Sequence, residues 1–266
     1  MRSRILRILQ LYDMQHVWTV EAIAREMGVS VSSAYRDVQE LSRAGFLDPV
    51  ASAGYVLGPA FIKYDRLIRA SDPLIGAAAP IMHQLLADTT QEGTAILCRR
   101  YRDCVMCVHQ ERGAQSRART FYERGVAMPL FIGAASKVIL AHLDERTLKR
   151  NYLDNREQIR EATGRPDLKS FRAELREIRR QGYAVTTAEL APGRVGFAAP
   201  VLVDGAIVAG LSLGGFHGAR LDPATQLDYA KEVSAAAKRI SKTVKRRGTW
   251  VPRGQLRQSF ALTSSL

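Results

Sequence analysis

The chain has 266 residues, 46% of them hydrophobic and 24% charged, a balance that is typical of a folded globular protein with two domains or one large one. It has no apolar run long enough to cross a membrane and no signal-peptide pattern, and its three cysteines are too few for a disulfide framework, so we expect a cytoplasmic protein. The net charge of +13 is unevenly distributed: the first 60 residues carry six basic and six acidic side chains, whereas Lys238 to the C-terminus carries eight basic and no acidic ones. Since a charge run is usually a solvated face, charge alone does not indicate nucleic-acid binding.

The first 58 residues have the pattern of three short helices followed by a hairpin. Apolar residues at helical spacing predict the first helix (Ile5, Ile8, Leu9, Tyr12). Thr19 is expected to cap the second helix, and Gly28 to end it in the left-handed conformation. Ser30 is expected to cap the third helix. Two short β-like runs then predict a hairpin (Phe46-Leu47, Tyr55-Val56-Leu57).

Two short helices joined by a Gly-Val-Ser turn have the spacing of a helix-turn-helix, whose second helix enters the major groove of DNA. The outward residues of that helix and the tip of the following hairpin, its wing, are the candidate DNA contacts: Ser32, Ser33, Tyr35, Arg36, Gln39 and Ser52. Hydroxyl groups near a helix N-terminus suit phosphates, and Arg36 or Gln39 suits base edges. The alternative is a winged helix used for protein contacts, because this segment has no net charge.

Beyond residue 58 the chain predicts a connecting helix and then an α/β pattern. Helical periodicity reaches Ser71, where Asp72-Pro73 interrupts it. Further helices are expected over 79–89, 133–143 and 223–244, with two more up to residue 181. Strands are expected over 94–99, 105–110, 183–189, 196–203 and 207–213, the last two joined by a hairpin turn at Val203-Asp204-Gly205-Ala206. The expected domains are a winged helix-turn-helix (1–58), a linker helix (59–72), an effector-binding domain (73–247) and a basic, flexible tail (248–266).

Three N-terminal segments resemble the DNA-binding domain of IclR-family regulators: residues 19–36, Ala44-Gly45-Phe46-Leu47, and Gly54-Tyr55-Val56-Leu57-Gly58, of which the last is the most telling. Five later segments follow in the family's order: residues 128–141, 181–184, 189–193, 197–201 and 209–215. The resemblance implies an α+β fold, in which a linker helix joins the winged helix-turn-helix to a GAF-like antiparallel sheet flanked by helices. It also implies a homodimer or homotetramer joined through both domains.

The same resemblance implies an effector pocket at Met128, Ala134, Ala135, Gly196, Ser212 and Gly214. The small residues that start the predicted helix 133–143 leave backbone N–H groups open to an anion. Ser212 and Gly214 share a strand face with Gly210 and are expected to form a floor of small residues under a cavity. Gly196 and Gly214 lack the polar side chains of certain relatives, so the resemblance does not identify the ligand. The alternative is that these small residues serve packing alone.

Signals for catalysis are lacking: no nucleophile elbow, phosphate loop or dinucleotide fingerprint occurs. Cys104 and Cys107 are three residues apart in a predicted strand and point to opposite faces, so we expect no metal site and no cofactor. We predict a ligand-responsive transcription repressor or activator that binds double-stranded operator DNA and a small organic or aromatic acid, without a membrane. The other hypotheses are a sensor module acting through protein contacts and an enzyme carrying a regulatory winged helix.

Overall fold

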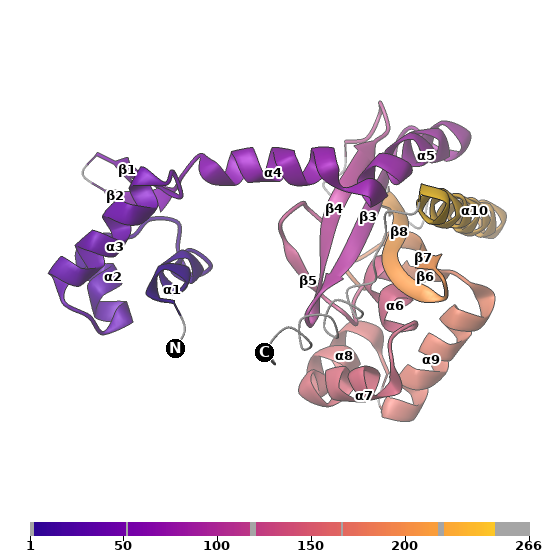
Figure 1. Cartoon of the computed structure of the whole chain (residues 1–266). Helices are drawn as coiled ribbons and strands as arrows, with labels where there is room; N and C mark the ends of the chain where they lie inside the picture. Colours follow the sequence, from indigo (N-terminus) through magenta and orange to yellow (C-terminus); the bar gives the residue numbers. More distant parts are fainter. Residues whose placement is uncertain (1–2, 52, 118–120, 166, 218–220, 248–266) are drawn as a thin grey trace, which may run out of the picture. The chain divides into compact units, whose positions relative to one another are not determined.

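The computed structural model describes residues 3–51, 53–117, 121–165, 167–217 and 221–247. The chain divides between Ser71 and Asp72 into two compact units (Figure 1). No helix among these residues is long and apolar enough to span a bilayer. The expected tail over 248–266 lies outside the described residues.

The N-terminal unit is a three-helix bundle with a wing, as predicted. Its elements are α1 (Arg4–Leu11), α2 (Val20–Met27), α3 (Val31–Arg43), β1 (Leu47–Val50) and β2 (Gly54–Leu57). The predicted caps are confirmed: Thr19 Oγ1 accepts the N–H of Ala22, and Ser30 Oγ accepts the N–H of Ser33. Gly28 has φ +65°, the left-handed conformation that ends α2.

The core of this unit joins the three helices to the wing. Its apolar side chains are Ile8, Leu11, Tyr12, Trp18, Ile23, Ala24, Met27, Ala34, Val38, Leu41 and Leu47. The Trp18 indole N–H donates to the Leu11 carbonyl over 3.1 Å, so that the ring is buried without an orphaned donor. The Trp18 backbone pairs with Tyr55 of β2 and so fastens the wing to the segment before α2. The last element of the unit is the helix α4 (Ala60–Ser71).

The helix α5 spans Pro73–Thr89 and is six residues longer at its start than predicted. Pro73 occupies the first turn, where a missing N–H costs nothing, and the Asp72 carboxylate accepts the N–H of Leu74 over 2.9 Å. The same carboxylate forms an ion pair with Arg99. The Asp72-Pro73 pair therefore starts a helix here as well as ending α4.

The C-terminal unit is built on a six-stranded antiparallel sheet in the order β5-β4-β3-β8-β7-β6. The strands are β3 (Thr94–Tyr101), β4 (Cys104–Arg112), β5 (Ala127–Pro129), β6 (Ala184–Thr187), β7 (Arg194–Val203) and β8 (Ala206–His217). The predicted turn between β7 and β8 is confirmed: Asp204 and Gly205 both have positive φ, +48° and +78°, as a two-residue hairpin of the Asp-Gly kind requires.

Helices cover both faces of this sheet (Figure 1). One face packs against α5 and α10 (Pro223–Arg247), and the other against α6 (Ala134–Leu140) and α9 (Leu168–Gln181). Between α6 and α9 lie α7 (Glu145–Asp154) and α8 (Arg156–Thr163). The described chain therefore has three helices between α6 and residue 181, where the sequence predicted two. Asn155 separates α7 from α8, because its backbone (φ −131°, ψ 24°) is not helical. The predicted α+β class is confirmed.

Gly210 has a different role from the one predicted for it. A Cβ at this position of β8 would lie 2.9 Å from the Ala135 carbonyl oxygen and 3.1 Å from Val138 Cγ2, so α6 rests directly on the strand. The face of Gly210 is therefore closed by α6 and is not the floor of a cavity. Farther along the same face, a Cβ at Gly214 would meet nothing within 4 Å.

We expect Gly210→Ala to lower the free energy of unfolding by about 1–3 kcal/mol, the usual cost of overpacking a core. Gly214→Ala on the same strand face is the matched control and should be close to neutral, because its Cβ enters open space. Urea unfolding of both variants checks this. Equal stability of the two variants would contradict the close contact between α6 and β8.

Candidate functional site

The exposed face of α3 carries most of the predicted DNA contacts. Ser32, Tyr35 and Arg36 are exposed, and Ser33 and Gln39 are half-buried. The sixth predicted contact, Ser52, lies outside the described residues.

Hydrogen bonds already engage part of this face. Ser30, Ser32 and Ser33 form a hydroxyl cluster, with Oγ–Oγ distances of 3.2 Å from Ser30 to Ser32 and 2.9 Å from Ser30 to Ser33. Gln39 Nε2 donates to the Tyr55 hydroxyl of the wing over 3.2 Å. Gln39 thus links α3 to β2 as well as facing outward.

A two-pronged ion pair holds α3 against α1. The Arg4 guanidinium approaches both carboxylate oxygens of Asp37, Nε to Oδ2 and Nη2 to Oδ1, each at 3.0 Å. Asp37 is buried, so its charge is turned away from the exposed face of α3 and is neutralised by Arg4. The side of α3 that would face DNA is therefore less acidic than its sequence alone indicates.

The C-terminal unit contains a cavity between the sheet and the start of α6, with about 520 Å³ of space that is partly open to solvent. The lining residues are Ile96, Phe121, Tyr122, Ala134, Thr186, Glu189, Leu190, Arg194, Val195, Gly196, Ser212, Gly214 and Gly215.

Four of the six predicted effector residues lie in this lining: Ala134, Gly196, Ser212 and Gly214. Met128 and Ala135 do not. Met128 lies on β5, where it pairs with Val105, and Ala135 lies on the buried side of α6, in the core. Small residues leave space because β8 bulges here, with Gly214 and Gly215 opposite the single residue Gly196 of β7.

Two hydroxyl groups in the lining have no partner. Ser212 and Thr186 are only 4% and 7% exposed, and within the described part of the chain neither hydroxyl makes a hydrogen bond. Both hydroxyls line a cavity that is partly open to solvent, so they are available to hydrogen-bond water or a ligand there. Arg194 adds a guanidinium, one nitrogen of which donates to the Gly215 carbonyl over 3.2 Å.

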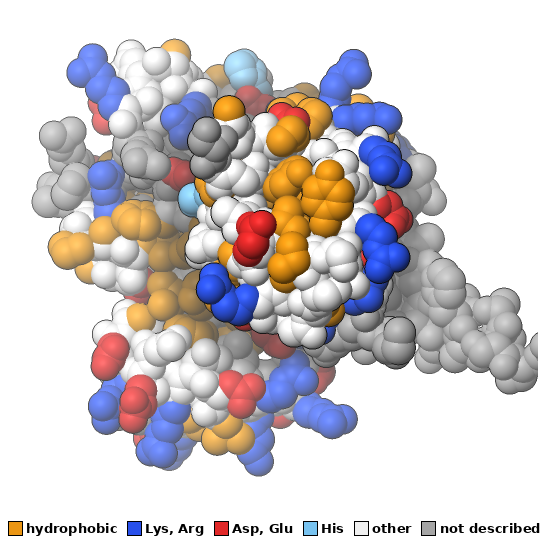
Figure 2. All heavy atoms as spheres, turned by 90° about the vertical axis from the view of Figure 1, so that its left-hand side faces the viewer, with side chains coloured by type: hydrophobic (Ala, Val, Ile, Leu, Met, Phe, Trp, Pro, Cys, Tyr) orange, Lys and Arg blue, Asp and Glu red, His pale blue; other side chains and the backbone are white. Residues whose placement is uncertain are grey.

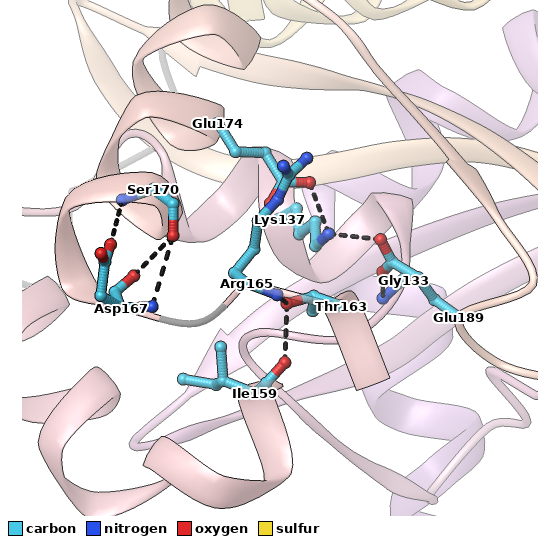
Figure 3. A network of polar contacts seen from close by, with 9 residues as sticks. All are labelled: Gly133, Lys137, Ile159, Thr163, Arg165, Asp167, Ser170, Glu174 and Glu189. Carbon is cyan, nitrogen blue, oxygen red and sulfur yellow. Dashed lines mark hydrogen bonds and ion pairs between the residues drawn. The ribbon is translucent and has the colours of Figure 1, made fainter. Parts of the chain in front are cut away.

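At the start of α6, the Gly133 N–H is not open to an external anion, contrary to the prediction. The Gly133 N–H donates to Glu189 Oε2 over 2.9 Å, so a carboxylate of the protein itself occupies this position. The other oxygen of Glu189 pairs with Lys137 (Figure 3). A ligand carboxylate placed here would meet the charge of Glu189.

Lys137 is fully buried and bridges three parts of the C-terminal unit. Its ammonium group on α6 pairs with Glu189, which follows β6, and with Glu174 of α9, whose Oε1 lies 2.6 Å from Nζ (Figure 3). Glu174 also accepts from Arg165 over 3.1 Å. Two cations and two carboxylates therefore balance in one network, as buried charges require.

Burial raises the pKa of two groups beside the cavity. The pKa of Glu189 is raised chiefly by burial, although Lys137 and the Gly133 N–H act in the opposite direction. Burial also raises the pKa of Tyr122 well above its usual value. The Tyr122 hydroxyl donates to the Ile132 carbonyl over 2.9 Å and is therefore a neutral structural group on the wall of the cavity.

Several lining residues escaped the sequence analysis, above all Glu189 and Arg194. The pairing of Thr186 with Gly196 across β6 and β7 brings Thr186 into the lining, but that register is not readable from either segment alone. Among the described residues, no group of three or more His, Cys, Asp or Glu side chains is placed to hold a metal ion.

Both units match known protein families. A family described as "Bacterial transcriptional regulator IclR C-terminal" matches residues 69–242, and an "HTH domain" family matches residues 4–56. The HTH-type transcriptional regulator BhcR of Paracoccus denitrificans (strain Pd 1222) is 26% identical over 216 residues, which is 80% of this chain and 76% of that protein.

Solved structures show the same fold. An IclR transcriptional regulator from Alicyclobacillus acidocaldarius is 26% identical, with a TM-score of 0.73 over 91% of this chain and 97% of that one. An IclR homolog from Microbacterium hydrocarbonoxydans, complexed with 4-hydroxybenzoate, is 20% identical, with a TM-score of 0.71 over 91% of this chain and 98% of that one.

Proposed function

Because the chain belongs to the IclR family of bacterial transcriptional regulators, we propose that its cavity binds a small organic acid and that α3 binds operator DNA. The observation that carries the effector half of this proposal is a cavity whose lining combines two hydroxyls without a protein partner, those of Ser212 and Thr186, with the Arg194 guanidinium. Each hydroxyl can donate one hydrogen bond to a ligand and accept others from it.

The charges of the lining favour an acid. Glu189 is paired with Lys137, whereas Arg194 presents a guanidinium to the same space. A guanidinium matches a carboxylate through two parallel hydrogen bonds. Ile96, Phe121 and Leu190 supply an apolar surface for a ring or short chain, so we propose an aromatic carboxylic acid. The 4-hydroxybenzoate in the Microbacterium relative supports this class of ligand.

The remaining parts of the proposal concern the whole chain. Residues 1–58 would form the DNA-binding domain, 59–72 the linker helix and 73–247 the effector-binding domain, acting in the cytoplasm without a catalytic role. Exposed apolar side chains on α4 would be covered in a homodimer or homotetramer: Phe61, Ile62, Tyr64, Leu67 and Ile68. The direction of control, repression or activation, depends on where the operator lies.

The test has two arms on the full-length protein. Rounds of selection from a random duplex library should enrich one DNA sequence, and thermal unfolding with a panel of aromatic acids should identify a ligand that raises the melting temperature. The ligand should then change the affinity for the selected duplex. Absence of any enriched sequence, or of any stabilising acid, would overturn the corresponding half of the proposal.

We expect Arg36→Ala to weaken binding of the selected duplex by about 1–3 kcal/mol and to relax its sequence preference, since Arg36 is exposed on α3. Arg43→Ala, at the other end of the same helix, is the matched control and should have a smaller effect, because the N-terminal residues of a recognition helix contact bases. Fluorescence anisotropy with matched and mismatched duplexes measures both. The same affinity and preference in Arg36→Ala as in the unmodified protein would remove Arg36 from the interface.

A further inference from the structure

Two large apolar side chains are exposed on α3, the helix expected to meet DNA. Val31 and Tyr35 are 50% and 52% exposed and lie four residues apart, hence on the same side of the helix. Hydrophobic side chains also gather at the centre of the face of the N-terminal unit shown in Figure 2, with Lys and Arg at its margin. Both residues lie on the same helix as the predicted base contacts and are accessible to a ligand of that helix.

The polar groups beside them offer little for reading bases. The hydroxyls of Ser30, Ser32 and Ser33 bond to one another, and Gln39 donates to Tyr55 of the wing. Arg36 also donates one weak hydrogen bond, to Ser33 Oγ over 3.5 Å, and its other guanidinium N–H groups are left to read bases. The sequence of the first 60 residues also has no net charge, so a non-specific attraction to phosphates is weak.

We propose that Val31 and Tyr35 contact thymine C5-methyl groups in the major groove, so that operator choice depends on those methyls. The inference rests on the proposed DNA-binding function and adds the chemical group that is read. Thymine alone presents an apolar group at the floor of the major groove, and its position distinguishes T·A from A·T and from both G·C orientations. Burying one methyl is worth about 0.8 kcal/mol, or about fourfold in affinity.

The experiment replaces thymines one at a time by deoxyuridine in a duplex selected by the full-length protein. Deoxyuridine keeps the base pair and lacks only the methyl group. We expect one or two positions in each half-site at which the substitution weakens binding about fourfold. Val31→Ser and Tyr35→Ser should each abolish the sensitivity at one of these positions, so that both duplexes bind the variant equally well.

Three variants make the test specific. Leu6→Ser removes an apolar side chain of the same unit that is 62% exposed on α1 and should retain the full sensitivity to deoxyuridine. Tyr35→Phe keeps the aromatic ring and should also retain the sensitivity to deoxyuridine. This variant separates the effect of the ring from that of the hydroxyl group. Val31→Thr keeps the shape of Val31 but places a hydroxyl on the surface, and should reduce the sensitivity. Thermal unfolding confirms that each variant is folded.

The outcomes separate the two levels of inference. Equal affinity for thymine and deoxyuridine duplexes overturns methyl recognition and leaves DNA binding intact. Sensitivity that persists in both Val31→Ser and Tyr35→Ser also overturns it, because other groups or the shape of the DNA would then read the methyls. Failure to select any duplex overturns the proposed DNA-binding function and this inference together.

Discussion

Replacing Lys137 by methionine is expected to lower the free energy of unfolding by about 3–5 kcal/mol at pH 7, the usual cost of removing one partner of a buried ion pair. The substitution keeps most of the apolar stem but leaves Glu189 without its cation in a buried position. Glu174 is less affected because Arg165 still contacts it. Urea unfolding followed by circular dichroism measures the change.

The loss should depend on pH, in a direction set by Glu189. The pKa of Glu189 is raised in the folded state, so the folded protein binds a proton here more tightly than the unfolded chain does. The resulting contribution to the free energy of unfolding is fully present below the ordinary pKa of 4.5 and is lost as the pH rises through the pKa of the folded state. Removing Lys137 takes away a charge that lowers this pKa, and the pKa therefore rises further. The cost of Lys137→Met should accordingly be smaller at pH 5 than at pH 7.

Two controls accompany this prediction. Lys137→Met combined with Glu189→Gln should recover part of the stability, because the uncompensated charge is then absent. Arg150→Met breaks the exposed pair with Asp103 and should cost less than about 1 kcal/mol. A Lys137→Met protein as stable as the Arg150→Met protein would show that the buried network does not hold α6, α9 and the segment after β6 together.

Arg194→Met should reduce the affinity for an aromatic carboxylate about 10- to 100-fold, as expected for losing hydrogen bonds to a charged group worth about 1.5–3 kcal/mol. Among the described residues that line the cavity, Arg194 is the one that carries a positive charge, and the Gly133 N–H at the start of α6 is occupied by Glu189. Isothermal titration calorimetry of the stabilising acid, with the variant and the unmodified protein, measures the change.

The carboxamide analogue of the same ligand is the matched control, since it has the shape of the acid without its charge. Its affinity should change little between Arg194→Met and the unmodified protein. Arg176→Met, an exposed substitution on α9, controls for the loss of a positive charge as such. An acid affinity that is unaltered in Arg194→Met would place the carboxylate elsewhere and contradict the proposed orientation of the ligand.

Local features of the sequence predicted the N-terminal unit and the turns well. Thr19, Gly28 and Ser30 act on backbone groups within four residues of themselves, so their caps follow from the residues alone. The Asp204-Gly205 turn is set in the same way by two residues that accept positive φ. The order of segments along the chain was likewise enough to indicate the family and the fold class.

The tertiary structure alone decided what lines the cavity and what closes it. Gly133 looked open to an anion, but Glu189, 56 residues later, occupies that place, and Lys137 on the next turn of α6 neutralises it. Gly210 and Gly214 look equivalent in sequence, yet α6 rests on the first and leaves the second open. Such outcomes depend on strand register, a bulge and the approach of a distant helix. They are set by contacts between residues far apart in the chain, which periodicity and capping do not encode.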